Sequence, residues 1–339
     1  MEPKIYFDGN INIEFENKKI ALDPENSTNA DLIFISHAHL DHTPNLETVI
    51  PKICTKATKD LIQHRKGMDM INTINFDSFD INGIHMKQLN SGHVTGSTSL
   101  LIEIKNKKIF YTGDICDKHR FHLKAAEIPK SDIMIIESTF GKEEYQFPNI
   151  SDTIDKSIKW IKEQLESKNS VALMGYPLGK AQIISKITEN FNIPIIVHNS
   201  IYHINEICKK YGFNGNGYLP ISDFLDILKK EQFIGIFPCS SKHVMSVKSI
   251  DSKYPIKTAA FSGWAIDQNY KNELGVDEAF VLSDHADFNG LLKIVKQSYP
   301  EKVYTFHGFE IEMAENIKDR LGIEARPLTE KRGNLSDFI

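Results

Sequence analysis

The sequence predicts an α/β fold in which short buried strands alternate with amphipathic helices. Apolar runs of four residues, rich in β-branched and aromatic side chains, recur along the chain, and each ends in a polar cluster. Between them lie stretches whose apolar residues recur every three to four positions, as in helices. A chain of 339 residues with 41% hydrophobic residues suits either one large domain or a core with an inserted second lobe.

Five predicted strands end directly before chemically reactive residues. The runs are 32–35, 108–111, 133–136, 279–282 and 303–306. They precede, in that order, the segments SHAHLDH, TGD, EST, SDHAD and HG. Loops at strand ends can project several side chains toward one point from a rigid sheet. We therefore expect these polar segments to converge on one site.

Helices are predicted at 154–165, at 179–191, at 289–299 and, near the end of the chain, at 311–321. Ser151 is the candidate N-cap of the first of them.

The domain organisation follows from where the reactive segments lie. The stretch 141–260 alternates helices and strands but contains no cluster of metal-ligand residues, so we predict that it is an inserted α/β cap domain. Residues 1–140 and 261–339 would then form one discontinuous core.

Composition restricts the class of partner and the compartment. The net charge of −5 disfavours a protein that coats long duplexes, although a local groove could still bind a few phosphates. Four widely spaced cysteines without a CxxC pair are typical of reduced thiols in a cytosolic protein. The N-terminal residues do not resemble a signal peptide, and no run of 18 apolar residues occurs. We expect a cytoplasmic protein that does not span a membrane.

The segment HAHLDH carries the strongest chemical signal. His37, His39, Asp41 and His42 offer three imidazoles and a carboxylate, which are the ligands that zinc prefers. Alternate residues His37 and His39 can face one ion, while Asp41 and His42 serve a second. The alternative is a polar loop that is rich in histidine by chance, because this chain has 13 histidines. The order HxHxDH after a buried strand favours metal binding.

HxHxDH resembles the signature of the metallo-β-lactamase superfamily, whose fold is an αββα sandwich. The resemblance implies a later histidine after a glycine and a later aspartate, and His93 and Asp114 stand in those places. The implied first site is His37, His39 and His93, and the implied second site is Asp41, His42 and a later histidine, with Asp114 bridging the two. Zinc is the expected metal for both positions, with manganese or iron as alternatives.

Three later segments resemble motifs A, B and C of the β-CASP nucleases, a group within that superfamily. They contain Glu137, His285 and His307, and the last of these would be the later metal ligand. The segments FSGWA and LSDHADFNGLL are similar to the ligase-associated DNA exonucleases of this group. RNA-cutting members also carry a histidine at the position of His307, so the choice between DNA and RNA stays open.

The resemblance and the chemistry of phosphodiesters together suggest roles for single residues. Asp41, Asp114, Glu137 and His285 are the predicted catalytic residues. His285 would protonate the leaving sugar oxygen as general acid, and Glu137 would orient its ring and raise its pKa. Candidate phosphate contacts are Lys180, Ser240, Ser241 and Lys242, although a solvated lysine and a serine-rich turn would look the same.

The sequence therefore predicts a nuclease that hydrolyses phosphodiester bonds with water activated by two divalent metal ions. An exonuclease acting on single-stranded DNA in repair is the first hypothesis, and a ribonuclease of RNA processing is the alternative. A small-molecule hydrolase of the same fold would not need the insertion or the SDHAD segment. A scaffold that only binds partners would not need the complete ligand set.

Overall fold

The computed structural model describes residues 2–328 apart from 26–27, 44–47, 68, 71, 76–77, 82 and 224. These residues form three sheets. The predicted strands are all present with bounds that differ by at most two residues, and the predicted helices with bounds that differ by at most four.

The first sheet has the order β1-β2-β3-β4-β5-β6. Its strands are β1 (Lys4–Phe7), β2 (Ile11–Phe15), β3 (Lys18–Leu22), β4 (Leu32–Phe34), β5 (Lys52–Ile53) and β6 (Thr73–Ile74). The second sheet has the order β19-β18-β11-β10-β9-β8-β7. Its strands are β7 (Ser78–Ile81), β8 (Ile84–Asn90), β9 (Thr98–Ile104), β10 (Lys107–Tyr111), β11 (Ile133–Ser138), β18 (Lys302–Gly308) and β19 (Glu324–Pro327).

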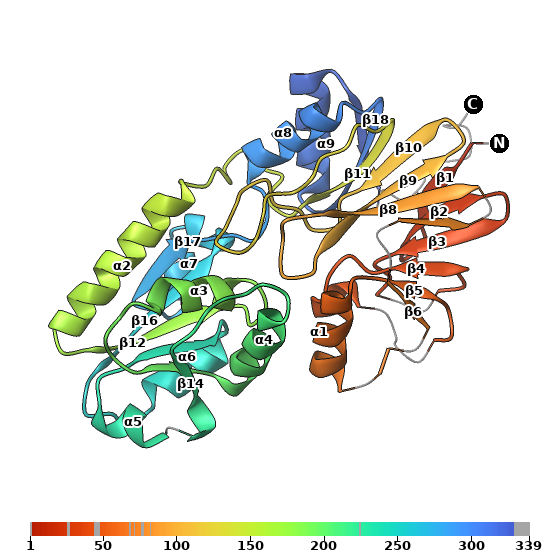
Figure 1. Ribbon diagram of the computed structural model, residues 1–339. Coiled ribbons are helices and arrows are strands. Elements are labelled where there is room, and N and C mark those ends of the chain that lie inside the picture. The colour runs from red at the N-terminus through yellow and green to blue at the C-terminus, as the bar shows by residue number, and fades with distance from the viewer. Residues whose placement is uncertain are drawn as a thin grey trace.

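The two sheets pack face to face, as Figure 1 shows on the right and at the top. Phe34 and Ile53 of the first sheet share a buried apolar cluster with Ile102 and Tyr111 of the second. Helices α8 (Phe288–Ser298) and α9 (Glu310–Leu321) cover the outer face of the second sheet, and α1 (Lys56–Lys66) packs on the first. The expected αββα sandwich is confirmed by this arrangement and by the sequence comparisons given below.

The third sheet is parallel and lies at the lower left of Figure 1, in green to cyan. Its order is β14-β13-β15-β12-β16-β17. The strands are β12 (Ser170–Gly175), β13 (Ile195–Val197), β14 (Tyr218–Pro220), β15 (Ile234–Pro238), β16 (Ile256–Ser262) and β17 (Glu278–Val281). The helices that accompany it are α2 (Ile150–Glu166), α3 (Lys180–Thr188), α4 (Asn199–Lys209), α5 (Leu225–Lys230), α6 (Ser241–Lys248) and α7 (Tyr270–Leu274).

The burial pattern explains why the third sheet is covered on both faces. Along β12, Val171 and Leu173 pack in the same apolar cluster as α2, α3 and α4, whereas Ala172 and Met174 pack with α6. Alternate residues of a strand point to opposite faces, so a continuous apolar run requires helices on both sides.

The structure also bears on two details of the predicted organisation. Strand β16 crosses residue 260 and β17 pairs with it, so the parallel sheet extends to Val281, beyond the predicted end of the insertion. The prediction of Ser151 as N-cap was wrong. Helix α2 begins at Ile150 with Asn149 at the cap, which places Ser151 inside the first turn.

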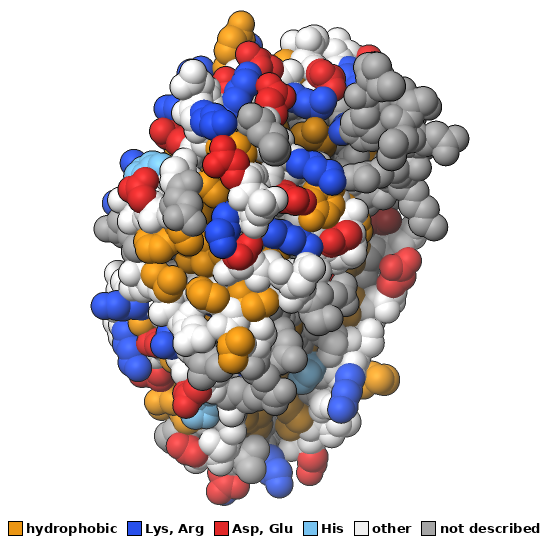
Figure 2. Space-filling view, turned by 90° about the vertical axis from the view of Figure 1, so that its right-hand side faces the viewer, with side chains coloured by type: hydrophobic (Ala, Val, Ile, Leu, Met, Phe, Trp, Pro, Cys, Tyr) orange, Lys and Arg blue, Asp and Glu red, His pale blue; other side chains and the backbone are white. Residues whose placement is uncertain are grey.

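The two lobes share one apolar cluster, which runs from Ile35 and Leu61 of the core to Ile184 and Ile201 of the inserted lobe. Figure 2 shows the face on the right-hand side of Figure 1, where basic and acidic side chains are interspersed. None of the described helices is long and apolar enough to span a lipid bilayer.

Candidate metal centre

Strand ends of both core sheets bring the predicted ligands together. His37 and His39 follow β4, and His42 lies in a 3-10 turn at Leu40–His42. His93 lies in the turn between β8 and β9, and Asp114 follows β10. These elements hydrogen-bond within rigid sheets, so the side chains reach one point from a fixed frame.

Two glycines allow these turns. Gly92 has φ of 71°, and a Cβ atom there would lie 2.5 Å from the carbonyl oxygen of Cys116. Gly113 has φ of 53°, and its Cβ would lie 2.7 Å from Ser36 Cβ. Both positions need positive φ and a close approach of the backbone, which only glycine allows without strain. The residue after each glycine, His93 or Asp114, is thereby turned inward.

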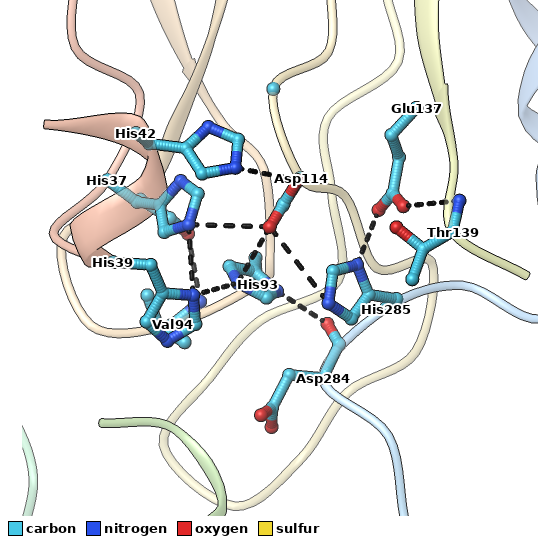
Figure 3. Close-up of polar contacts among 12 residues, drawn as sticks. His37, His39, His42, His93, Val94, Asp114, Glu137, Thr139, Asp284 and His285 are labelled. Carbon is cyan, nitrogen blue, oxygen red and sulfur yellow. Dashed lines mark hydrogen bonds and ion pairs between the residues drawn. The ribbon is translucent and has the colours of Figure 1, made fainter. Parts of the chain in front are cut away.

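The first group of donors is His37, His39, His93 and Asp114, whose ligand atoms lie within 4.8 Å of one another. Asp114 Oδ2 is 3.4 Å from Nε2 of His37 and 3.4 Å from Nε2 of His93 (Figure 3). The Nδ1 atom of His39 lies 3.0 Å from His37 Nε2. One ion placed among these atoms would have three imidazoles and one carboxylate oxygen.

The second group is His42, Asp114 and His307. The other carboxylate oxygen of Asp114, Oδ1, faces His42 Nε2 at 3.6 Å. The rings of His42 and His307 lie 5.1 Å apart. His307 has φ of 60°, an uncommon backbone conformation for a residue with a side chain, and such strain is concentrated at functional sites. Asp114 therefore presents one oxygen to each group.

The donor chemistry fits metal ions. His42 Nε2 and Asp114 Oδ1 are buried without a hydrogen-bond partner in the described chain, which is costly unless another group satisfies them. Burial and the neighbouring imidazoles lower the pKa values of His37 and His93 well below the usual value, so both rings are neutral, as metal ligands must be. Burial also lowers the pKa of His39, to about 4.

His42 differs from the other ligands because carboxylates surround it. Burial acts to lower its pKa, but Asp114 and Asp23 raise the pKa to about 10. The same carboxylates that favour a proton on this ring would favour a metal cation in its place.

Asp23 was not predicted from the sequence. Its Oδ2 lies 3.0 Å from His42 Nδ1 and also accepts from the hydroxyls of Ser36 and Tyr111. A carboxylate that holds one ring nitrogen leaves the other free for a metal. Asp23 directly follows the apolar strand β3, so the strand-end rule that found the other segments would have found it as well.

Asp41 is less closely placed than the other predicted ligands. Its side chain is 67% exposed, and Oδ2 lies 3.9 Å from His42 Nε2. It does not belong to any of the tight donor groups among the described residues. Its role as a ligand remains a prediction.

Glu137 and His285 form a buried pair beside Asp114. The Nδ1 atom of His285 lies 2.9 Å from Glu137 Oε1, and its Nε2 lies 4.0 Å from Asp114 Oδ2 (Figure 3). Glu137 is fully buried, and Oε1 also accepts the backbone N–H of Ile115. Burial lowers the pKa of His285, but Glu137 and Asp114 outweigh it and raise the pKa above the usual value. The pair thus favours the protonated form of an imidazole next to the donor groups.

A cavity of about 480 Å³ opens onto this centre. Its walls come from the core (Asp41, Arg65, Thr139 and Phe140) and from the inserted lobe (Tyr176, Lys180, Ser262, Gly263 and Trp264). Figure 3 shows the histidines pointing toward Asp114 from one side and His285 from the other.

The predicted phosphate contacts are arranged differently from expectation. Lys180 lines the cavity, but its Nζ is 2.7 Å from the buried carboxylate of Asp284. Ser240 caps α6 by accepting the N–H of His243, and Lys242 lines a second cavity of the inserted lobe. Ser240, Ser241 and Lys242 do not line the cavity at the metal centre.

Comparisons with known proteins agree with this geometry. Residues 14–166 match the family model "Beta-lactamase superfamily domain", and residues 278–326 match "Zn-dependent metallo-hydrolase RNA specificity domain". A solved structure of a protein of unknown function from Enterococcus faecalis V583 superposes with a TM-score of 0.64 at 16% identity, over 97% of this chain and 98% of that one. At this identity the superposition supports the fold alone.

One named relative is a DNA ligase, and two others are named for the cleavage of RNA or as a cleavage and polyadenylation factor. A probable DNA ligase of Opitutus terrae is 28% identical over 86% of this chain, which spans 28% of the ligase. Cleavage and polyadenylation specificity factor subunit 3-I of Arabidopsis thaliana is 28% identical over 65% of this chain and 36% of that protein. An RNase J-like protein of Methanocaldococcus jannaschii is 26% identical over 82% of this chain and 81% of its own length.

Both family models fall on the segments that build the metal centre, and β12 to β16 of the parallel sheet lie between the two matched ranges. The chain therefore belongs to the metallo-β-lactamase superfamily and, within it, to the β-CASP family.

Proposed function

We propose that this protein is a metal-dependent exonuclease that shortens single-stranded DNA ends. The observation that carries the proposal is the juxtaposition of two donor groups, which share Asp114, with the Glu137–His285 pair. Two divalent cations, most simply zinc, would be held by His37, His39 and His93 and by His42 and His307, with Asp114 common to both. When bound, they would supply Lewis acidity and lower the pKa of the attacking water.

The residues of the chain would handle the proton that the leaving group needs. Glu137 accepts the Nδ1–H of His285, which fixes the ring and favours its protonated form. The opposite nitrogen, Nε2, faces the Asp114 side of the cavity. A proton held there is in place to pass to the departing sugar oxygen as the bond to phosphorus breaks.

The cavity supports action near an end of a strand. Its volume of about 480 Å³ falls within the range of sites that enclose one small molecule, roughly 300–1,000 Å³. Tyr176 lies at its wall with a side chain that is 46% exposed, and an exposed ring can stack on a base of any sequence. A space of this size suits a terminal nucleotide better than the middle of a duplex.

DNA is favoured by the ligase relative, because 86% of this chain aligns with part of a protein named as a DNA ligase. A nuclease that trims an end and a ligase that seals it act on the same kind of substrate. RNA is the second candidate. It is favoured by the RNase J-like relative, which the chain covers over 81% of that protein's length, and by the RNA specificity model at 278–326.

The exonuclease proposal can be tested with linear and circular single-stranded DNA of one sequence. We expect the zinc-loaded protein to degrade the linear strand to mononucleotides and to leave the circle intact. Cleavage of the circle at a comparable rate would overturn the exonuclease assignment and leave an endonuclease.

A further inference from the structure

A second cavity, of about 550 Å³, lies between α5 and α6 on one face of the parallel sheet and reaches the carboxyl edge of the sheet at His198 and His243. His198 follows β13, and Phe237 lies in β15, the neighbouring strand. The chain leaves β13 toward β14 at the sheet edge, but it leaves β15 in the opposite direction, across β12 to β16. Such a reversal opens a crevice between the two strand ends, which is where open α/β sheets bind ligands.

The lining of this cavity combines an apolar floor with a basic rim. Two lysines and two histidines (Lys229, Lys242, His198 and His243) line it together with one acid, Asp251. Ile221, Leu228, Phe237, Val247 and Ile250 supply the apolar surface. A ligand that is anionic at one end and flat and apolar at the other would match both parts.

Hydrogen bonds orient both imidazoles in the same way. The Nδ1 atom of His198 accepts the backbone N–H of Ser200. The Nδ1 atom of His243 lies 2.7 Å from the hydroxyl oxygen of Ser240, which itself accepts the backbone N–H of His243. The neutral ring of His198 therefore carries its proton on Nε2, and the Ser240 hydroxyl holds His243 in the same tautomer when it donates to Nδ1.

These two N–H groups favour an anionic ligand. Within the part of the chain that the structure describes, neither Nε2 has a hydrogen-bond partner. The ring centroids of His198 and His243 are 5.4 Å apart. Two neighbouring N–H donors suit phosphate oxygens, whereas a metal ion would need unprotonated nitrogens.

The cavity lies on the same sheet edge as the metal centre. Tyr176 and Lys180 follow β12, Ser262 ends β16, and all three line the cavity at the metals. Strand β15 pairs with β12 on one side and with β13 on the other. At a strand spacing of about 4.8 Å, β13 lies roughly 10 Å from β12 along this edge. A few nucleotides of one strand span that distance, since even in duplex DNA the rise is about 3.4 Å per nucleotide.

We propose that this cavity binds a nucleotide of the substrate strand that lies a few nucleotides away from the scissile bond. Its phosphate contacts His198, His243, Lys229 and Lys242, and its base lies on the apolar floor. This proposal rests on the proposed function and deepens it. The chemistry recognised is a phosphate joined to a base. The strand itself is the source favoured here, because the cavity shares an edge with the metal centre.

The test compares two double variants in the zinc-loaded protein. Lys229→Ala with Lys242→Ala removes the two lysines of the cavity. Lys156→Ala with Lys162→Ala makes the same change of charge on α2, where both lysines are exposed and lie outside the cavity. Binding of a fluorescent strand of about twelve nucleotides is followed by anisotropy at several salt concentrations, in a His285→Ala background that slows cleavage.

We expect the cavity variant to weaken binding about 10-fold and to make the salt dependence shallower by about 0.7 for each phosphate that the protein no longer neutralises. The α2 variant should change neither quantity. Equal affinities and equal slopes for the two variants would overturn the cavity assignment and leave the nuclease proposal standing. If the parent protein binds neither DNA nor RNA strands, the proposed function fails instead.

A further arm separates the two sources of the ligand. Free adenosine monophosphate is titrated against the bound strand. Weak competition supports the strand, because the mononucleotide cannot reach along the sheet edge to the metal centre. The opposite result is that the mononucleotide displaces the strand at concentrations well below those at which the strand itself binds, and that the lysine variant abolishes this effect. A free small-molecule ligand would then replace the strand in this assignment.

Discussion

The metal centre and the cavity of the inserted lobe are built in opposite ways. At the metal centre, His37 and His93 are completely buried and face the shared carboxylate of Asp114, and Glu137 is completely buried and holds His285. Around the second cavity, Lys229 and Lys242 are exposed, and His198 and His243 are only half-buried. Chemistry at phosphorus needs donors that are fixed and shielded from water. Holding a flexible strand needs cations that remain accessible, and it tolerates their mobility. If both proposals hold, bond cleavage and strand binding occupy separate places along one edge of the parallel sheet.

The largest effect should follow from breaking the shared ligand. We expect Asp114→Asn to abolish detectable cleavage and to lower the zinc content per chain, because one carboxylate serves both donor groups. Metal analysis and an end-label assay on the same preparation measure both. A variant with full metal content and unchanged rate would show that Asp114 is not the common ligand.

The next effect separates catalysis from metal binding. We expect His285→Ala to slow cleavage by about 10²–10⁴-fold while zinc content stays at the parent level, since the ring acts on the proton and not on the metal. Single-turnover rates, with metal analysis alongside, provide the measurement. Loss of zinc in this variant would reassign His285 as a ligand.

The next prediction concerns Asp284, which lies beside the metal centre, and the free energy of unfolding. Asp284 is buried between Arg120, at 3.0 Å, and Lys180, at 2.7 Å. Asp284→Ala would leave two buried cations without their partner, so we expect a loss of about 3–5 kcal/mol in the free energy of unfolding. Denaturant unfolding measures this, with the exposed Asp155→Ala on α2 as the control. A loss no larger than that of the control would contradict the structural role.

The smallest of these effects concerns Asp23. Because it holds the far nitrogen of His42, we expect Asp23→Asn to weaken zinc binding about 10–100-fold, with activity recovered by added zinc. A competition titration with a chelator gives the affinity. Unchanged affinity would mean that Asp23 serves only to hold Ser36 and Tyr111, which also hydrogen-bond to it, and not to orient His42.

The parts of the fold and the site that could be predicted from the sequence depend on local patterns of residues. His37, His39 and His42 all follow the end of β4 in one short segment. Residues that are close in the sequence are therefore also close in space here. The predicted strands and helices around them were found for the same reason, since apolar periodicity is also a local property.

Apart from Asp23, the features that were missed depend on tertiary structure. His198 and His243 are neighbours only because β13 pairs with β15. Lys180 lies at the start of a helix as expected, but its partner Asp284 comes from beyond β17, so the buried ion pair of these two residues could not be predicted from the sequence. The predicted end of the insertion at residue 260 likewise ignored the pairing of β16 with β17.

The nuclease activity is best tested by incubating the zinc-loaded protein, of known metal content, with end-labelled single strands of DNA and RNA of identical sequence. A parallel set with manganese and an Asp114→Asn control complete the experiment. We expect two metal ions per chain and degradation of DNA, both lost in the control, whereas degradation of RNA alone would change the substrate and keep the site. If the protein holds two ions and cuts neither strand with either metal, the nuclease proposal is contradicted and a small-molecule hydrolase takes its place.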